Sequence, residues 1–182
     1  RESFIDLKQD YSTIKSSYRK SYKALISKGY KLLHPHKLEK NNLNVWKEFK
    51  ALHYKAAGRK TRSDMSWEIL LEQIKENKAN FYFCRDVNGV MIGGSLVMKS
   101  ENEAFYAIAA YDRDLFHFPI GHLLQDFIIK DLLNTKIQWY RLGRLYRVTD
   151  FDNPTEKEIQ IGQFRSGFSS HLITSYRFTD FN

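Results

Sequence analysis

Three residues of the sequence have the chemistry of a general base, and each lies in a different predicted helix. His122 falls in the first turn of its helix, where the helix dipole favours the neutral imidazole that a base requires. His53 falls on the apolar side of its helix and Glu158 near the start of a third. A core histidine at position 53 and a surface histidine at position 122 are the structural alternatives. As general bases, these groups would take a proton from an acceptor.

A second group of residues has the chemistry of anion binding. Arg59, Thr61 and Arg62 belong to a compact basic loop between two predicted helices, and Arg113 follows a predicted strand. An arginine can hold a phosphate or carboxylate through two parallel hydrogen bonds. An ordinary solvated turn explains the basic loop equally well, so charge alone leaves both interpretations open.

Neither a metal site nor a reactive thiol is predicted. His34 and His36 form a pair without further ligands, and we interpret them as part of a loop. Cys84, the single cysteine, lies inside a predicted strand, which favours a small core residue over a nucleophile and excludes an internal disulfide. The sequence contains no P-loop, nucleotide-binding glycine fingerprint or serine elbow.

Composition places the chain among soluble globular proteins. It has 182 residues, 42% of them hydrophobic, which is enough for a domain with a real core. No apolar run reaches membrane length, so we expect a cytoplasmic protein without membrane insertion. The formal net charge of +8 favours a polyanionic partner, such as nucleic acid, a nucleotide-bearing cofactor or a phosphorylated lipid. A lysine-rich solvated surface is the alternative.

The elements that must position these residues centre on residues 80–143. Strands are predicted over residues 81–84, 90–98 and 105–111, with Asn88 and Gly89 forming a type I′ hairpin turn between the first two. A helix follows Pro119, and residues 137–142 form a further strand ended by a glycine. A right-handed crossover makes the strands on either side of the helix parallel. The sheet can splay where the pairing changes, and ligands bind at such places. Tyr106, Tyr111 and Tyr140 would line that cleft, unless they belong to the core.

The flanking segments complete the prediction. Residues 1–29 read as one helix, at a junction with an upstream domain, and residues 30–182 as the main domain. A short strand is predicted over residues 30–33. Asn44 is the predicted cap of a helix that ends at Gly58. Asp64 or Ser66 caps the next helix, and Thr155 with Glu158 forms a capping box. The last predicted strand covers residues 171–176.

Several strings in this order resemble the FemAB-like branch of the GNAT acyltransferase superfamily. The first is HYKAAGRKTR at residues 53–62, with Trp67 a few residues on. Further strings are YDR at 111–113, GH at 121–122, WYRLG at 139–143, KE at 157–158 and FRSGF at 164–168. The resemblance covers residues 44–178 and matches the C-terminal GNAT-like unit of such proteins.

The resemblance implies an α/β fold with a GNAT-like mixed sheet. In it, antiparallel hairpin strands lead into a β-α-β crossover, and helices cover both faces. It also implies transfer of an acyl group to an amine. The donor in most such enzymes is acetyl-CoA or another acyl-CoA, and in the Fem branch an aminoacyl-tRNA with a peptidoglycan precursor as acceptor. The implied substrate-binding residues include Trp67, Lys157 and Arg165, and Gly121 with His122 would hold the cofactor.

Two departures from the family pattern bear on the chemistry. The Gly-rich loop that holds the CoA pyrophosphate is represented only by Gly121, although the start of the helix remains. Arg165 stands where the Fem-type string has lysine, and an arginine does not readily transfer protons.

Two classes of function therefore remain. The first is an N-acyltransferase that acts on an amine of a cell-envelope or surface-glycan precursor, with a tRNA-dependent aminoacyl transferase as its variant. The second is a non-catalytic GNAT-like domain that binds an anionic ligand.

Overall fold

The computed structural model, which describes residues 1–39, 42–150, 152–174 and 176, has one mixed sheet with helices on both faces. The sheet has seven strands in the order β2-β3-β4-β5-β6-β1-β7. In chain order the strands are β1 (Glu2–Asp6), β2 (His34–Lys37), β3 (Ala79–Arg85), β4 (Met91–Lys99), β5 (Glu103–Tyr111), β6 (Trp139–Arg144) and β7 (His171–Ile173). The helices are α1 (Tyr11–Ser17), α2 (Lys20–Leu32), α3 (Leu43–Ala57), α4 (Asp64–Lys75), η1 (Arg113–Leu115), α5 (Ile120–Leu132) and α6 (Glu156–Ser166).

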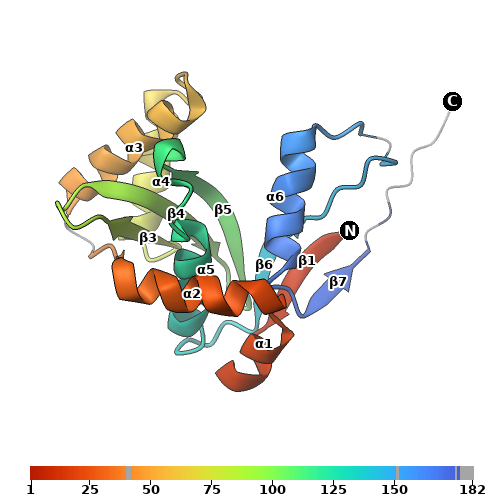
Figure 1. Cartoon of the computed structure of the whole chain (residues 1–182). Helices are drawn as coiled ribbons and strands as arrows, with labels where there is room; N and C mark the ends of the chain where they lie inside the picture. The colour runs from red at the N-terminus through yellow and green to blue at the C-terminus, as the bar shows by residue number, and fades with distance from the viewer. Residues whose placement is uncertain (40–41, 151, 175, 177–182) are drawn as a thin grey trace, which may run out of the picture.

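One pair of neighbouring strands differs from the rest of the sheet. β5 and β6 run parallel, joined by the crossover helix α5, whereas the other neighbouring strands of the described chain run antiparallel. Their pairing covers only Glu103 with Trp139, Ala104 with Tyr140, and Phe105 with Arg141. Beyond these pairs β5 continues beside β4, and β6 continues beside β1. The sheet therefore forks, as Figure 1 shows.

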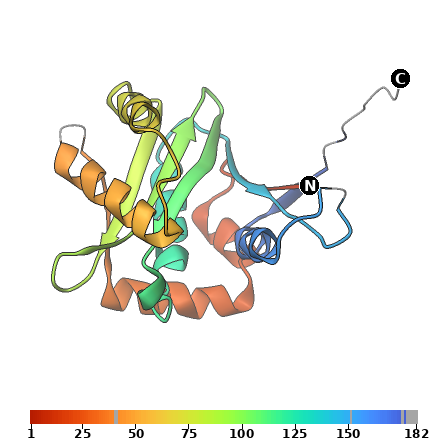
Figure 2. The same cartoon turned by 90° about the horizontal axis from the view of Figure 1, so that it is seen from above.

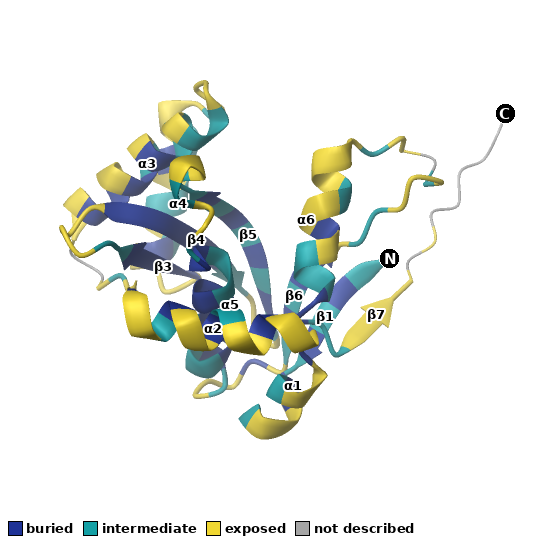
Figure 3. Cartoon of the chain, in the orientation of Figure 1, coloured by how far each residue is buried: buried dark blue, intermediate teal, exposed yellow. Residues whose placement is uncertain are grey.

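Helices cover the two faces of the larger half of the sheet. α3 and α4 pack on one face, where Trp46, Phe49, Trp67 and Phe81 form an aromatic core. α1, α2 and α5 belong to a second core on the other face. Figure 2 shows α3 and α2 on opposite sides of the strands, and Figure 3 shows buried central strands beneath helices with exposed outer surfaces. The mixed sheet, the crossover and the two helical layers confirm the predicted fold class.

Helix ends are set by local chemistry. The side chain of Asn42 accepts a hydrogen bond from the backbone N–H of Val45 and begins α3, which ends at the left-handed Gly58 with φ of 68°. Ser63 caps α4 in the same manner. The predicted caps at Asn44, Asp64 and Ser66 were therefore wrong by one to three positions. The capping box of Thr155 and Glu158 is confirmed.

The N-terminal third differs most from the sequence prediction. Residues 1–29 form β1, α1 and the greater part of α2 rather than one helix, and Gly29 is a buried interior residue of α2. Residues 30–33 complete α2 and its cap instead of forming a strand. Pro35 lies within β2, an edge strand where its missing N–H is tolerated. β1 pairs with β6 and β7, so these residues belong to the same sheet, whereas the upstream junction stays a prediction.

Three further details are corrected. Only Gly89 has a positive φ in the hairpin, so the turn is not type I′. Asp86 and Val90 instead flank a three-residue loop closed by the Gly89 N–H on the Asp86 carbonyl. Gly143, predicted to end β6, is an interior residue of that strand with φ of 109°. β7 ends at Ile173, earlier than predicted, and Ser175 lies outside the described residues.

The packing between α3 and β4 predicts the effect of Gly94→Ala. A Cβ at Gly94 would lie 2.7 Å from a ring carbon of Phe49 and 2.8 Å from one of Phe81. Both rings are fully buried, so we expect the substitution to lower the free energy of unfolding by about 1–3 kcal/mol. Urea unfolding measures this. Val87→Ala, at a side chain that is 92% exposed, is the control and should change stability by less than about 0.5 kcal/mol. Equal stability of Gly94→Ala and the native chain would contradict this packing.

Candidate functional site

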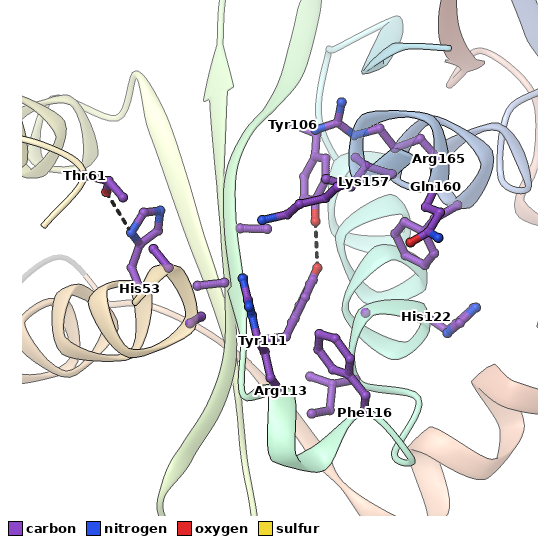
Figure 4. A pocket seen from close by; sticks show the side chains of 18 of the residues that line it. His53, Thr61, Tyr106, Tyr111, Arg113, Phe116, His122, Lys157, Gln160 and Arg165 are labelled. Carbon is purple, nitrogen blue, oxygen red and sulfur yellow. Dashed lines mark hydrogen bonds between the residues drawn. The ribbon is translucent and has the colours of Figure 1, made fainter. Parts of the chain in front are cut away.

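The fork between β5 and β6 opens into a cavity of about 850 Å³ (Figure 4). Its walls come from the end of α3 and the following basic loop, from β5, from the start of α5 and from α6. The polar lining residues are His53, Thr61, Arg62, Tyr106, Tyr111, Arg113, His122, Lys157, Gln160 and Arg165. Segments that are more than a hundred residues apart in the sequence, from His53 to Arg165, therefore meet at the fork.

Two tyrosines from β5 lie at the base of the cleft. Their hydroxyl groups are 2.6 Å apart in a hydrogen bond between Tyr106 and Tyr111, and the Tyr111 hydroxyl lies 3.3 Å from the Ser95 hydroxyl (Figure 4). Burial raises the pKa of Tyr111 well above its usual value. The phenol is therefore protonated at neutral pH, and it can donate a proton to a group that becomes negatively charged in the cleft.

The α6 wall supplies two cations. Lys157 is exposed and points from α6 into the cavity (Figure 4). The Arg165 guanidinium lies 5.4 Å from the centre of the Tyr106 ring, a cation–π contact. Gly143 makes room for it, because a Cβ there would lie 2.7 Å from a terminal nitrogen of Arg165. The glycine and the arginine, distant in sequence, are thus fitted to each other.

The opposite wall holds His53 in contact with Thr61 and Arg62 of the basic loop. Its Nδ1 lies 3.2 Å from the Thr61 hydroxyl, and its Nε2 lies 3.4 Å from an Arg62 nitrogen. A guanidinium can only donate, so Nε2 is the acceptor and Nδ1 carries the hydrogen. Burial, together with the charge of Arg62, lowers the pKa of His53. The imidazole is therefore neutral, but both of its nitrogens are already engaged.

The charge of the lining is one-sided. Arg62, Arg113, Lys157 and Arg165 all border the cavity, and none of the lining residues is an aspartate or a glutamate. None of these four cations has an ion-pair partner in the described part of the chain. Uncompensated positive charge in a partly enclosed cleft attracts anions, and the planar guanidinium groups suit phosphate or carboxylate.

The start of α5 borders the cleft but has no glycine-lined cradle. Pro119 precedes the helix and makes no side-chain cap. A Cβ on Gly121 would lie 3.2 Å from the ring of Phe164, so close packing against α6 accounts for that glycine. These residues do not fit the pyrophosphate loop that the family pattern requires for CoA. At the start of α5, the free backbone N–H groups of the first turn can still bind an anion.

His122 lies in an aromatic cluster rather than free in the cleft. Its ring contacts those of Tyr22, Phe164 and Phe168, at centroid distances of 4.4, 5.1 and 6.1 Å. Figure 4 shows the ring on the side of α5 that faces away from Tyr106 and Tyr111. Burial, with a smaller effect of Arg19, lowers its pKa to about 4. The neutral form expected from the sequence is present, but burial causes it.

Four predicted site residues lie outside the cleft lining. Tyr140 is fully buried and donates a hydrogen bond to Gln125, and Trp67 belongs to the aromatic core under α3 and α4. The Glu158 carboxylate is occupied by the Thr155 cap, which lowers its pKa. Arg59 is exposed in the basic loop beside the cleft. Their functional roles stay untested predictions, and the geometry supports a structural role for Tyr140, Trp67 and Glu158.

The sequence prediction missed several lining residues. Gln160 and Ile161 follow Lys157 on α6, and Phe116 and Phe118 come from the segment after η1. Phe116 is 66% exposed and forms an apolar edge of an otherwise cationic cleft. The turn spacing from Lys157 to Gln160, Ile161 and Phe164 was the available signal, because residues three or four apart share one helix face. No pattern in the sequence indicates the two phenylalanines.

A metal-binding group and a membrane-spanning helix are both absent from the described residues. They contain no group of three histidine, cysteine, aspartate or glutamate side chains suited to a metal ion. Burial raises the pKa of the Cys84 thiol to about 12, which fits the predicted core position. Nor does any helix in the described part of the chain have the length and apolarity to cross a membrane.

Comparisons with known proteins establish the fold. No protein-family model and no curated protein sequence matches the chain. FemX matches with a TM-score of 0.73 and 11% identity, over 92% of this chain and 57% of the FemX chain. The aminoglycoside acetyltransferase meta-AAC0020, from an uncultured soil metagenomic sample, matches with a TM-score of 0.61 and 15% identity over 82% of this chain and 97% of its own. L-PGS from Bacillus licheniformis matches with a TM-score of 0.60 and 16% identity over 86% of this chain and 48% of its own.

These matches confirm the fold that the sequence resemblance implied. The chain has the fold shared by FemX and the acetyltransferases, and it spans only about half the length of the FemX and L-PGS chains.

The buried position of His122 predicts a dependence of stability on pH. Its folded-state pKa of about 4 lies below its ordinary value of 6.5. Between these values the unfolded chain binds a proton that the folded chain does not, so stability falls as pH is lowered from 6.5 to 4. Urea unfolding at several pH values should show a smaller fall for His122→Gln than for the native chain. His117→Gln, at an exposed position, should keep the native pH dependence. An unchanged slope in His122→Gln would contradict the burial of this ring.

Proposed function

We propose that the cleft is the site of an N-acyltransferase, which moves an acyl group, acetyl or aminoacyl, onto an amine of a cell-envelope or surface-glycan precursor. The observation that carries the proposal is the opening of the sheet beyond Phe105 and Arg141, where four cations and a protonated tyrosine line one cavity. Support also comes from the shared fold with FemX and the acetyltransferases.

The cationic lining assigns the acceptor to a chemical class. A substrate whose charged groups are all ammonium groups would be repelled by the four lining cations, Arg62, Arg113, Lys157 and Arg165. No lining residue is a carboxylate that could bind such a substrate. The acceptor therefore carries phosphate or carboxylate groups in addition to its amine. This property favours an anionic precursor over a polycationic acceptor such as an aminoglycoside.

The same charge activates the amine. Nearby positive charges disfavour a further cation, so the pKa of the bound ammonium falls and the amine enters as its neutral, nucleophilic form. This effect reduces the need for a strong base, which matters because His53 has both nitrogens engaged and His122 faces away from the tyrosines. Electrostatic stabilisation by the cations also lowers the energy of a tetrahedral oxyanion.

Tyr111 is the proposed proton donor to the leaving group. The nitrogen–acyl bond forms as the bond from the acyl carbon to the acyl donor's sulfur or oxygen breaks, and Tyr111 gives a proton to that atom. The proton that the amine nitrogen loses returns to Tyr111 through Tyr106 or Ser95, which are hydrogen-bonded to it, so the tyrosine ends the step protonated. The raised pKa of Tyr111 keeps its phenol protonated until charge develops on the leaving group.

The extended part of the acyl donor would lie along β5. Its edge beyond Phe105 is not paired with β6, so backbone groups on that side can bind an extended chain as an added strand would. Ala109 and Ala110 line this stretch, and their small side chains leave space. The donor is either an acyl-CoA or an aminoacyl-tRNA. The packing of Phe164 over Gly121 favours a donor that does not depend on a glycine cradle.

A non-catalytic anion-binding domain is the second candidate. It is favoured by the engaged nitrogens of His53 and by Arg165 in place of the family's lysine. Such a domain would use the same four cations but would make no use of the phenol of Tyr111.

A thermal-shift panel separates the donors. It contains acetyl-CoA, CoA, aminoacyl-tRNA and UDP-linked amino sugars, at low and moderate salt. We expect a UDP-linked sugar to raise the melting temperature, since its phosphates match the cations, and one acyl donor to do so as well. Absence of a shift with all of them would contradict the proposal.

Tyr111→Phe tests the proton donor. The assay uses the acyl donor that raises the melting temperature of the chain. We expect turnover to fall about 100-fold while the affinity for this acyl donor stays unchanged, because only proton transfer is lost. Tyr140→Phe, which removes the hydroxyl of the neighbouring buried tyrosine, is the control and should keep native turnover. Equal turnover in both variants would exclude Tyr111 as the proton donor. No turnover in the native chain would favour the second candidate, a non-catalytic anion-binding domain.

Arg62→Gln tests the charge of the cleft, with Arg59→Gln as a matched control from the same loop. Arg62 lines the cavity and Arg59 does not, so only Arg62→Gln should weaken binding of the anionic acceptor, by about tenfold for one lost charged hydrogen bond. Isothermal titration measures this. Unfolding of Arg62→Gln would instead mark the loop as a structural clamp.

A further inference from the structure

The first two helices carry charge of a single sign. Residues 11–38 contain no aspartate or glutamate. Their cations are Lys15, Arg19, Lys20, Lys23, Lys28, Lys31 and Lys37. Of these, only Lys37 forms an ion pair within the described part of the chain, with Asp131. A surface of paired charges, which the net charge alone would allow, is therefore absent from α1 and α2.

Three of these cations border a second cavity, of about 300 Å³, whose lining comes from α1, α2 and the end of α5. Lys15, Lys23, Lys31 and Lys130 line it, with the rings of Tyr11 and Tyr30. The Lys130 ammonium lies 4.8 Å from the centre of the Tyr11 ring and 4.4 Å from that of Tyr30. The aromatic walls thus hold one lysine in place, and the other three come from α1 and α2.

One carboxylate lies below the cavity, and its hydrogen bonds are already made. Asp126 is fully buried and accepts hydrogen bonds from the hydroxyls of Tyr11 at 2.7 Å and Tyr30 at 3.0 Å. It also pairs with Lys130 at 2.9 Å. One of the four lysines is thereby neutralised, and Lys15, Lys23 and Lys31 remain without an ion pair in the described chain.

The cations are spread along a line rather than gathered around one point. Lys20 and Lys31 are eleven residues apart on α2, which is about 16 Å at 1.5 Å per residue. Several negative groups in a row, as on a phosphodiester chain, match that spread better than one small anion does. The 300 Å³ cavity at the middle suits one of those phosphates.

We propose that the α1–α2 face and this cavity form an electrostatic docking surface for the phosphate backbone of a nucleic acid. A lipid surface fits less well, because Leu32 is the one large apolar side chain exposed on α1 or α2. The surface is distinct from the cleft, since Gly121 and Lys130 are about 14 Å apart along α5. The inference therefore does not depend on the proposed function.

The test measures binding of a fluorescent single-stranded oligouridylate by anisotropy at 50 and 200 mM salt. The triple variant Lys15→Gln, Lys23→Gln, Lys31→Gln should bind about tenfold or more weakly at the lower salt concentration. The slope of log affinity against log salt should fall by about 2, because each lost phosphate contact removes about 0.7.

The matched control removes the same charge from the other face. Lys47, Lys75 and Lys78 lie on or just after α3 and α4, and their change to Gln should alter affinity by less than about threefold through the net charge alone. Thermal melting of both variants confirms that they are folded. Equal weakening in the two variants, no binding by the native chain, or displacement of the oligonucleotide by anionic vesicles but not by unlabelled RNA would overturn the proposal.

Discussion

Three residue pairs between β5 and β6 hold the two halves of this sheet together. Arg141 reinforces the junction, since its guanidinium pairs with Glu103 of β5 and Glu2 of β1 and lies 4.4 Å from the centre of the Phe105 ring. Beyond it each strand has a different partner, and the crossover helix α5 connects the halves. The short parallel pairing is the constraint that produces the cleft. A longer ladder would close the fork and leave Tyr106 and Tyr111 within a continuous sheet.

The cleft and the α1–α2 face share one electrostatic property. In both, cations from separate elements border a cavity. The cleft lining contains no carboxylate, and the one carboxylate beside the second cavity, Asp126, is buried and paired with Lys130. Uncompensated charge of one sign raises the folding free energy through self-repulsion, so its persistence at two cavities points to anionic ligands.

The sequence predicted the centre of the fold better than its edges. Alternation, a hairpin turn and a helical stripe identify β3, β4, β5, α5 and β6, because those elements are bounded by strong local signals. β1 and β2 were missed, since Glu2–Asp6 precedes a long helical pattern and a strand with Pro35 and two histidines reads as a loop. The cleft cations were found through their residue types. The capping role of Glu158 was visible in its spacing from Thr155. The orientation of His122 and the hydrogen bonds of His53 depend on how side chains from separate segments meet in the fold, and no spacing reveals them.

Hydrogen exchange along β5 tests the central claim most directly. If the unpaired edge of β5 binds the extended arm of an acyl donor, saturating donor should slow amide exchange in residues 106–110, while peptides containing β2 keep their native rate. The measurement reads the edge of the fork itself and needs no knowledge of the acceptor. Protection of residues 106–110 with the acyl donor is the predicted result. Unchanged exchange there, with protection confined to another part of the chain, would show that the fork is not the donor site.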